Sequence, residues 1–551
     1  MKQAAKLVLG ITLFALICLT PVFASGTQDK TEAGQEQVTE GPFDPMAKYD
    51  PSIVVTAVRE LPDTVLFVDG EDIENNIWTR KFIEDLGINL KYDWISNSYE
   101  EKLNIAIASN QLPDIIPVGL NILPALVESG VAADLTDLID KYAIPITIEM
   151  FEADNYTGIR QVSTNDRIYA LPNCIGAKDM VTYFHVRTDW LDNLGLDVPK
   201  TIDDLVEVAR AFTEQDPNNT GEDDTIGLAT QKSFDQFKTG GMDGFFEGFG
   251  AYINGWVDDG KGGIVYGGIQ KETRDALQTL AEMFSDGLLD PEFSVKASAG
   301  DLVASGNTGL FYGPHWIVFG DANTTVQNDP NAMWKVYPIP SIDDNPARPM
   351  ANGSVANCYV INSKAEHPEA VIKLYNMFLD TISNVSPNYD IEYNVDAESI
   401  YFRYSYPPMQ VFWPNKNLAA HREVMGRFDG GKGNSEGLSA DGVFILDVIL
   451  DYYNNNNRTQ WHTWAWSGPD NSAMSVCDYY DKNDLLLENG YLLTATPTMV
   501  EKQSSLNDLR DQVFTKIIMG REDITAFDNF VEDWKRLGGN EITAEVNEMR
   551  K

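Results

Sequence analysis

An acidic loop at residues 216–224 has the oxygen spacing of a calcium site. Its oxygen-bearing side chains stand at loop positions one, three, five and nine: Asp216, Asn218, Thr220 and Asp224. Glycine at position six permits the sharp turn, and Glu222 at position seven would contribute its backbone carbonyl. Gly227 stands where a complete loop carries a bidentate glutamate, so the pattern predicts a shortened Ca²⁺ site at best. The alternative is an acidic, asparagine-rich surface turn without a metal.

Tryptophans in loops beside glycine, proline or asparagine form a second group that could bind a ligand. Five tryptophans have such surroundings: Trp256, Trp316, Trp461, Trp464 and Trp466. Flat aromatic faces flanked by amides and carboxylates suit the apolar faces and hydroxyl groups of sugar rings. Any one of these side chains could instead fill space inside the protein. For Trp316, which ends the string Gly-Pro-His-Trp, we favour ligand contact.

Two short strings resemble enzyme motifs, but their surroundings do not support the chemistry. Residues 426–433 resemble a phosphate-binding loop, yet Gly433 replaces the Ser or Thr that would hold magnesium. Residues 433–437 match Gly-x-Ser-x-Gly in a glycine-rich stretch, without the buried strand and helix that create the strained turn. The five histidines include no pair at metal spacing, and among 83 acidic residues no glycosidase pair can be singled out.

The charge balance limits the classes of ligand. The chain of 551 residues carries 83 Asp and Glu against 41 Lys and Arg, a net charge of −42. So acidic a surface repels phosphate backbones and anionic lipid headgroups, which argues against nucleic-acid partners and favours neutral or cationic ligands. With 43% apolar and 23% charged residues, the composition is that of a globular protein of about two to four domains.

The N-terminus has the residue order of a secretory signal. Two lysines precede an apolar run over residues 7–19, and Pro-Val-Phe-Ala precedes Ser25. The pattern predicts a signal peptide over residues 1–24, cleavage after Ala24 and a soluble protein outside the cytoplasm. Cys18 is an alternative site of lipid attachment, although Ile17 stands where lipoprotein signals usually need a small residue.

Three cysteines would remain after cleavage: Cys174, Cys358 and Cys477. Their odd number allows one disulfide at most, so no disulfide framework stabilises the fold. None belongs to a Cys-x-x-Cys motif, which argues against zinc and thiol-redox chemistry.

Strand and helix signals alternate along the chain and predict α/β layers. Residues 52–58 and 87–94 have strand character and enclose a segment that we expect to form a helix. A capping box at Ser98 predicts a helix that Pro113 ends, and a strand follows at residues 114–118. Further helices are predicted after Thr201, at 277–284, at 370–378, and at 527–534 before Gly538-Gly539.

Six segments together resemble those of a known protein family. They are residues 98–117, residues 169–172, residues 186–191 with 199–201, the loop at Asp216, residues 309–316 and residues 530–534. In order and spacing they are similar to the carbohydrate-type extracellular solute-binding proteins of bacterial ABC importers, particularly the long members that bind oligosaccharides or alginate. The resemblance covers nearly the whole mature chain.

The resemblance implies a two-lobed α/β fold of the periplasmic-binding-protein type (type II). Its lobes would be joined by crossing segments near residues 174–183 and 341–352, close about a hinge, and hold ligand in the cleft between them. The tryptophan of the family's Gly-Pro-x-Trp string, here Trp316, would stack on a sugar ring. Weaker candidates for this cleft are Trp256, Tyr183, Trp464, Trp466 and Trp94.

The resemblance also implies a calcium ion in the loop at Asp216, as in the alginate-binding members. This sequence departs from them at Thr225, where they carry an acid, and the departure favours a structural role for Ca²⁺ over a ligand-linked one.

We therefore expect a monomeric, non-catalytic receptor that delivers an oligosaccharide to the transmembrane subunits of an ABC permease. The expected organisation is a signal peptide (1–24), a flexible linker (25–50), first-lobe parts at 51–178 and 345–430, and second-lobe parts at 179–344 and 431–551, with the calcium-like loop at 216–225. The alternatives are a secreted polysaccharide-active enzyme and a peptide- or lipid-binding receptor on the same fold, since fold does not fix the ligand.

Overall fold

The computed structural model of the protein describes residues 43–62, 65–174, 176, 178–232, 234, 238–353, 355–394 and 402–550. The predicted signal peptide, Cys18 and most of the predicted linker lie outside these residues. No helix in the described part of the chain is both long and apolar enough to span a bilayer. The described residues form two lobes, each built on a β-sheet with helices on both faces.

The first lobe contains a five-stranded sheet with the order β2-β1-β3-β14-β6. Its strands are β1 (Ile53–Arg59), β2 (Ile88–Ile95), β3 (Ile115–Val118), β6 (Leu171–Cys174) and β14 (Val355–Ile361). β1 pairs in parallel with β2 and β3, whereas β14 runs antiparallel to β3 and β6. The first-lobe sheet is therefore completed by a strand that follows the strands of the second lobe.

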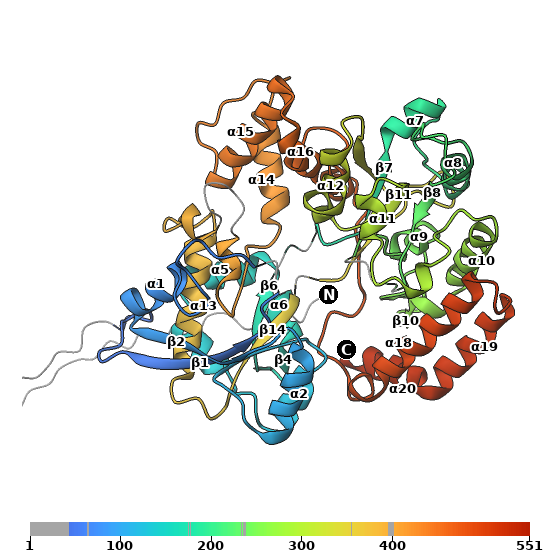
Figure 1. The fold of residues 1–551 in the computed structure, drawn as a ribbon. Helices are drawn as coiled ribbons and strands as arrows, with labels where there is room; N and C mark the ends of the chain where they lie inside the picture. Colours follow the sequence, from blue (N-terminus) through green and yellow to red (C-terminus); the bar gives the residue numbers. More distant parts are fainter. Residues whose placement is uncertain are drawn as a thin grey trace, which may run out of the picture. The chain divides into compact units, whose positions relative to one another are not determined.

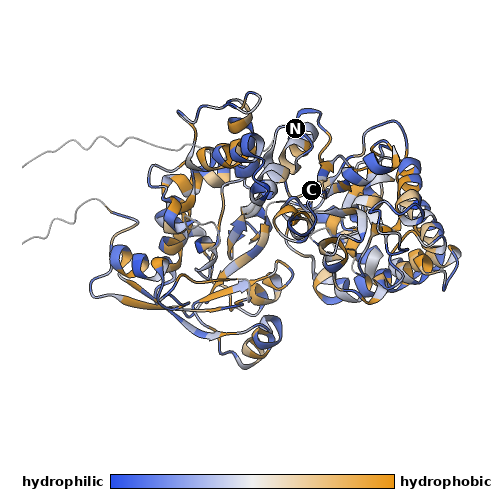
Figure 2. Cartoon of the chain, turned by 45° about the horizontal axis from the view of Figure 1, so that its top comes forward, coloured by the Kyte–Doolittle hydropathy of each residue, from blue (hydrophilic) through white to orange (hydrophobic). Residues whose placement is uncertain are grey.

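Helices bury both faces of this sheet because apolar residues alternate along its strands (Figures 1 and 2). Ile115 packs on one face and Ile116 on the other. One face is covered by α1 (Ile77–Leu86), α4 (Thr136–Tyr142), α5 (Pro145–Ala153) and α13 (Pro368–Ile382). The other face is covered by α2 (Tyr99–Ser109) and α3 (Leu123–Glu128). The remaining elements before β6 are α6 (Thr157–Gln161), β4 (Ser163–Thr164) and β5 (Arg167–Ile168).

The second lobe contains a four-stranded sheet with the order β12-β7-β11-β8. Its strands are β7 (Tyr183–Arg187), β8 (Ile226–Ala229), β11 (Thr308–Gly313) and β12 (Trp334–Tyr337). Tyr183 pairs with Gly313 at one end of the sheet, and Arg187 pairs with Trp334 at the other. Every residue of β7 and β11 is buried, as expected for central strands covered on both faces.

Two groups of helices cover the second sheet. The first group packs around α8 (Ile202–Glu214), α9 (Asp243–Gly248), α10 (Lys271–Ser285), α18 (Pro497–Ile518), α19 (Thr525–Trp534), α20 (Asn540–Met549) and the hairpin of β9 (Trp256–Asp258) and β10 (Ile264–Tyr266). The second group contains α11 (Gly300–Ala304), η3 (His315–Phe319), α12 (Asp321–Asn328), α16 (Trp461–Ser467) and α17 (Ala473–Lys482). Also in this lobe are α7 (Thr188–Leu194) and α15 (Ala440–Asn455).

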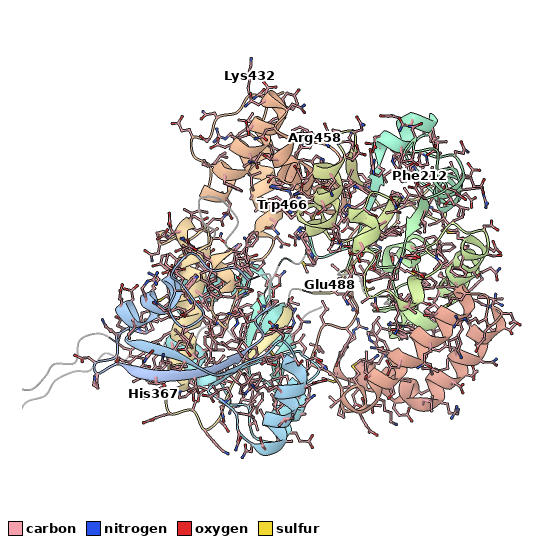
Figure 3. The ribbon with its side chains drawn as sticks, viewed as in Figure 1. Phe212, His367, Lys432, Arg458, Trp466 and Glu488 are labelled. Atoms are coloured by element: carbon pink, nitrogen blue, oxygen red, sulfur yellow. The ribbon has the colours of Figure 1, made fainter. Side chains whose placement is uncertain are left out.

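Two connections join the sheets, and a third passage between the lobes follows Trp413 and leads to residues 416–425 in the second lobe. The chain leaves the first sheet at Cys174 and enters the second at Tyr183, and it returns from Tyr337 to Val355. On the way back, β13 (Met350–Ala351) pairs in parallel with β15 (Leu487–Glu488), which contains the Glu488 labelled in Figure 3. These connections coincide with the crossing segments predicted near residues 174–183 and 341–352. We call residues 175–182 the first crossing and residues 338–349 the second crossing.

The folded body begins earlier than the predicted linker boundary at residue 50. The Tyr49 hydroxyl donates a hydrogen bond to Glu369 Oε1 (2.8 Å), and Lys373 Nζ donates to the Ala47 carbonyl (2.6 Å). Lys373 is 4% exposed and lies 4.3 Å from the centre of the Tyr49 ring. These contacts compensate the buried ammonium group and attach the last residues of the predicted linker to α13.

The helix α14 (Lys416–Met425) packs in the second lobe, although we expected residues 345–430 in the first. Leu418 belongs to the buried cluster of β7, β11 and α17, and Ala420 and Val424 pack against α15 and α16. The apolar side of α14 therefore finds its partners in the second lobe. The other predicted lobe boundaries stay predictions.

The predicted helix starts differ in how well their caps form. Thr201 caps the start of α8, as predicted, and Asp204 completes a capping box with it. The capping box predicted at Ser98 is wrong, because the Ser98 side chain makes no capping hydrogen bond. Its ψ of 58° departs from the extended backbone that lets a capping side chain reach the first turn. The helix predicted at 527–534 is α19, and the chain bends after it at Gly538, whose φ is 148°.

Candidate functional site

Aromatic side chains from η3 and α16 gather at the end of the second sheet where the first crossing enters it. We define the aromatic cluster as His315, Trp316, Phe319, His462 and Trp466. The rings of His315 and Trp316 meet edge to face at 5.0 Å, and Phe319 lies 5.7 Å from Trp466. Trp316 and Trp466 are half-buried and Phe319 is 43% exposed, so the cluster keeps accessible aromatic surface. Trp466, which is labelled in Figure 3, packs against two clusters of buried side chains, one that includes α12 and one that includes α14.

His315 is the centre of this cluster. Trp466 Nε1 donates a hydrogen bond to His315 Nδ1 at 3.0 Å, so the neutral ring carries its proton on Nε2. His315 Nε2 lies 3.8 Å from Asp179 Oδ2 in the first crossing. Burial lowers the pKa of His315, an effect that Asp179 opposes and Lys416 adds to. The neutral ring therefore fixes the orientation of the Trp466 indole at neutral pH.

Acidification is expected to destabilise the protein through His315. Because the pKa of His315 in the folded chain lies below its ordinary 6.5, the unfolded chain binds more protons, and stability falls as the pH drops below about 6.5. His315→Asn should flatten the slope of unfolding free energy against pH by up to about 1.4 kcal/mol per pH unit. Urea unfolding between about pH 5 and pH 7 measures the slope. Buried His421, whose pKa is lowered to about 4, titrates in the same direction, and His421→Asn serves as the comparison. An unchanged slope in His315→Asn would contradict the assignment.

The first crossing carries a fully buried carboxylate. Asp179 is 0% exposed, and its Oδ2 accepts a hydrogen bond from Asn417 Nδ2 at 2.7 Å. Its Oδ1 has no hydrogen-bond partner among the described residues. The same holds for two buried side-chain oxygens of the first lobe, Gln161 Oε1 and Asn173 Oδ1. Buried acceptors normally have donors, and hydroxyl groups are suitable ones. No sequence signal pointed to Asn417, and Asp179 was marked only by its place in a predicted crossing.

Two residues predicted to line the cleft are instead in the protein core. Trp256 is 7% exposed and packs against Tyr266 in the β9–β10 hairpin, with ring centres 5.9 Å apart. Tyr183 is fully buried in β7, where its hydroxyl donates to the Asp179 carbonyl at 3.0 Å. Neither side chain offers a face to a ligand in this structure. Both are covered because their strands belong to hydrogen-bonded sheets with packed helices.

The two other predicted tryptophans lie apart from the aromatic cluster. Trp464 packs on Tyr452, Tyr453 and Phe428, with ring centres 5.1 to 6.3 Å away. Trp94, in the first lobe, lies 5.4 Å from the Tyr99 ring and under Lys102 Nζ at 4.9 Å. The structure therefore brings Trp316 and Trp466 together, but not Trp464 or Trp94.

The acidic loop folds so that its oxygen side chains converge. Asp216 Oδ1 accepts from the Thr220 N–H (3.0 Å) and Oδ2 from the Gly221 N–H (2.9 Å). Asn218 Nδ2 donates to Asp224 Oδ1 at 3.0 Å. Gly221 has a φ of 79°, the conformation that the glycine of such a loop must adopt. The Glu222 side chain is exposed, and its backbone N–H donates to Thr220 Oγ1.

The oxygen atoms of this loop suit a hard cation, although few of them belong to carboxylates. No group of three or more His, Cys, Asp or Glu side chains that could hold a metal occurs among the described residues. The loop offers two carboxylates together with amide, hydroxyl and carbonyl oxygens, which are calcium ligands. Thr225, at the position of the missing acid, is 5% exposed, and its hydroxyl donates to the Phe212 carbonyl at 2.7 Å. It therefore ties the loop to α8.

Two surface cavities lie away from the aromatic cluster. One of about 630 Å³ lies at the opposite end of the second sheet, between the acidic loop, Asp189 and Asp329. Its wall includes Arg187, which is 2% exposed and forms a bidentate pair with Asp189 (2.8 and 2.6 Å). The other, of about 1110 Å³, lies between residues 195–208 and the second crossing.

The family model of bacterial extracellular solute-binding proteins matches residues 71–382, more than half of the chain. The lipoprotein LipO of Bacillus subtilis is 25% identical over 481 residues, covering 84% of this chain and 86% of LipO.

Solved structures of two other proteins have a similar fold. The Streptococcus pneumoniae ABC-transporter substrate-binding protein FusA in complex with kestose has a TM-score of 0.63 at 16% identity, covering 90% of this chain and 98% of FusA. A second solved structure contains an EF-hand mutant of FusA in complex with fructo-nystose. The alginate-binding protein AlgQ2 without calcium ion has a TM-score of 0.61 at 15% identity, covering 91% of this chain and 98% of AlgQ2.

The two lobes, their two crossing segments and the similar solved structures agree on the fold. The match over residues 71–382 decides the family. Proteins of this kind act outside the cytoplasm and bind solutes without transforming them. The chain belongs to the bacterial extracellular solute-binding protein family.

Proposed function

We propose that this protein captures an oligosaccharide and delivers it to the transmembrane subunits of an ABC importer. The observation that carries the proposal is the aromatic cluster, in which Trp316 and Trp466 keep accessible rings beside the first crossing. Aromatic faces bind the apolar faces of sugar rings. FusA and AlgQ2, whose fold is similar, are named for kestose and alginate binding, which supports the same class of ligand here.

Thermal unfolding with a panel of oligosaccharides tests the proposal. A sugar present at about 100 times its dissociation constant should add about 2.7 kcal/mol of stability. The panel should include fructooligosaccharides such as kestose as well as alginate fragments, and each mixture should be analysed for cleavage afterwards. A shift with intact sugar supports the receptor. Consumption of a sugar would favour an enzyme, and absence of any shift would favour a peptide or lipid ligand.

We also propose that the acidic loop holds a structural Ca²⁺ ion through Asp216, Asn218, Thr220, Glu222 and Asp224, the last by its carboxylate and Glu222 by its carbonyl. The convergent oxygens support this proposal. The EF-hand mutant of FusA and the calcium-free form of AlgQ2 are consistent with a metal loop in related folds. When bound, the cation would neutralise the two carboxylates and fix the loop against the end of α8.

Asp216→Ala is expected to remove the calcium-dependent part of the stability. The variant loses a carboxylate that would bind the cation, so its melting temperature should fall by a few degrees more in calcium than in chelator, where it loses only the hydrogen bonds from Thr220 and Gly221. Differential scanning calorimetry in both buffers measures this. Asp259→Ala, at another exposed acidic turn, is the control. Equal losses in calcium and in chelator would reject the metal loop.

The N-terminal residues direct the protein to its place of action in our proposal. Cleavage after Ala24 releases a mature protein, whereas lipid attachment to Cys18 would tether it to the membrane, as the name of LipO indicates for that relative. Intact-mass spectrometry of the processed protein distinguishes the two. We propose the first form, with the protein acting as a monomer.

A further inference from the structure

We infer that helix α9 fixes both crossing segments to the second lobe, and that Asp243 and Glu247 are positioning residues for the closure of the lobes on ligand. The inference rests on the proposed function for its effect on binding. The hydrogen bonds of α9 are observed among the described residues and do not depend on that function. Figure 1 shows α9 beside β8 and β11 in the second lobe.

One short helix bonds to both of the connections that join the two sheets. Thr182, the last residue of the first crossing, donates its hydroxyl to Asp243 Oδ2 at 2.5 Å. The Met350 N–H, directly after the second crossing, donates to Glu247 Oε1 at 3.1 Å. Within the second crossing, the Ile342 N–H donates to the Gly248 carbonyl at 2.9 Å. The two segments, distant in sequence, thus share one anchor.

The packing around α9 leaves no room for side chains on its inner face. A Cβ atom at Gly244 would lie 2.5 Å from Tyr312 Cδ1 and 2.6 Å from Thr182 Cγ2. A Cβ atom at Gly248 would lie 2.4 Å from the Pro340 carbonyl oxygen. The pattern Asp-Gly-x-x-Glu-Gly therefore places two carboxylates and two glycines, each pair one helical turn apart, against the crossing segments.

This anchoring limits where these two connections bend. Since Thr182 and Met350 are both bonded to α9, these two residues, one in each connection, move with the second lobe. Bending during closure then takes place on the first-lobe side of these two residues. If either bond is lost, the crossing gains freedom and the closed form is less well defined, which should weaken ligand binding.

Burial and the neighbouring Asp243 both favour the protonated form of Glu247. Asp243 and Glu247 are 2% and 5% exposed, and burial, followed by the charge of Asp243, raises the pKa of Glu247 well above its ordinary 4.5. The other groups that influence this pair are the hydroxyls of Tyr252, Tyr312 and Tyr480, and Arg348 beside Tyr252. Neutral Glu247 avoids repulsion with Asp243. Deprotonation would place two like charges in one buried turn.

Hydrogen exchange of the ligand-free protein tests the anchor directly. Glu247→Ala removes the acceptor of the Met350 N–H, and Thr182→Val removes the donor to Asp243 while keeping the side-chain volume. Each should speed exchange about tenfold in the crossing that it releases, and weaken the affinity for the oligosaccharide identified by thermal unfolding about tenfold. Glu247→Gln keeps a neutral acceptor and should stay within about twofold of the unchanged protein.

The pH profile separates positioning from mere stabilisation. As the pH rises above about 4.5, the unchanged protein loses stability relative to Glu247→Gln, because the folded chain holds a proton that the unfolded chain releases. Affinity should likewise fall towards alkaline pH in the unchanged protein and stay flat in Glu247→Gln.

A control variant and two contrary outcomes complete the test. Thr325→Val removes another buried hydroxyl bond of the second lobe, from Thr325 to the Val303 carbonyl, and should lower the melting temperature without changing exchange at the crossings. Unchanged exchange in both Glu247→Ala and Thr182→Val would overturn the inference, as would an equal increase in Thr325→Val. If the unchanged protein binds no oligosaccharide, the proposed function fails, while the exchange result still decides the role of α9.

Discussion

Replacing Trp316 with alanine is expected to weaken binding of the cognate oligosaccharide by about 1–3 kcal/mol, roughly five- to 150-fold. Trp316 presents a half-buried ring next to His315 in the aromatic cluster, which also contains the partly exposed Phe319. Removing the ring deletes a stacking face but little of the protein core. Isothermal titration calorimetry with the sugar identified by thermal unfolding measures the loss.

The control for Trp316 is an aromatic residue of similar exposure away from the cluster. Phe444, on α15, is 42% exposed, and Phe444→Ala should leave the affinity within about twofold of its original value. Trp466→Phe provides a finer comparison, because it keeps an aromatic ring but loses the Nε1–H that bonds to His315. If Trp316→Ala bound the sugar as tightly as the unchanged protein, the ligand site would lie elsewhere.

Replacing Trp256 with alanine is expected to have the opposite signature, a loss of about 3–5 kcal/mol of stability with little change in affinity. Trp256 is 7% exposed and belongs to the main buried cluster of the second lobe. Its removal would leave a cavity between the β9–β10 hairpin and the rest of the cluster. Urea unfolding gives the stability, and calorimetry below the unfolding transition gives the affinity of the folded fraction.

Trp256→Phe is the matched variant, since it keeps an aromatic ring next to Tyr266 and should lose less than half as much stability. A large loss of affinity in Trp256→Ala at unchanged stability would instead return Trp256 to the ligand site. The two tryptophan predictions therefore test opposite roles with the same pair of measurements.

Local sequence patterns determined much of the fold. β-Branched residues at 52–58 and the alternation at 87–94 specified strands, and Thr201 specified the start of α8, because these signals act within one turn or one pleat. Ser98 has the same type of signal, but its backbone adopts another conformation. A capping box thus names a helix start without guaranteeing the hydrogen bond.

The acidic loop was also readable from the sequence, because its oxygen side chains are only a few residues apart and the turn is built from local hydrogen bonds. Asp216 accepts from the backbone of Thr220 and Gly221 within the same loop. The order of segments that resembles the solute-binding family spans the chain in the same way. For the loop and for the family resemblance, the spacing of residues along the chain was a sufficient signal.

The sequence by itself determined the element types, the two-lobed class and the metal-like loop, whereas only the tertiary structure decided which aromatic residues are accessible. Trp256 and Trp316 both have glycine nearby in the sequence, yet Trp256 is buried in the main cluster of the second lobe, whereas Trp316 is only partly buried against another cluster. The contacts of Asp179 with Asn417 and of Thr182 and Met350 with α9 likewise join distant parts of the chain. Burial and long-range hydrogen bonds depend on which elements pack together, and local periodicity carries no information about that choice.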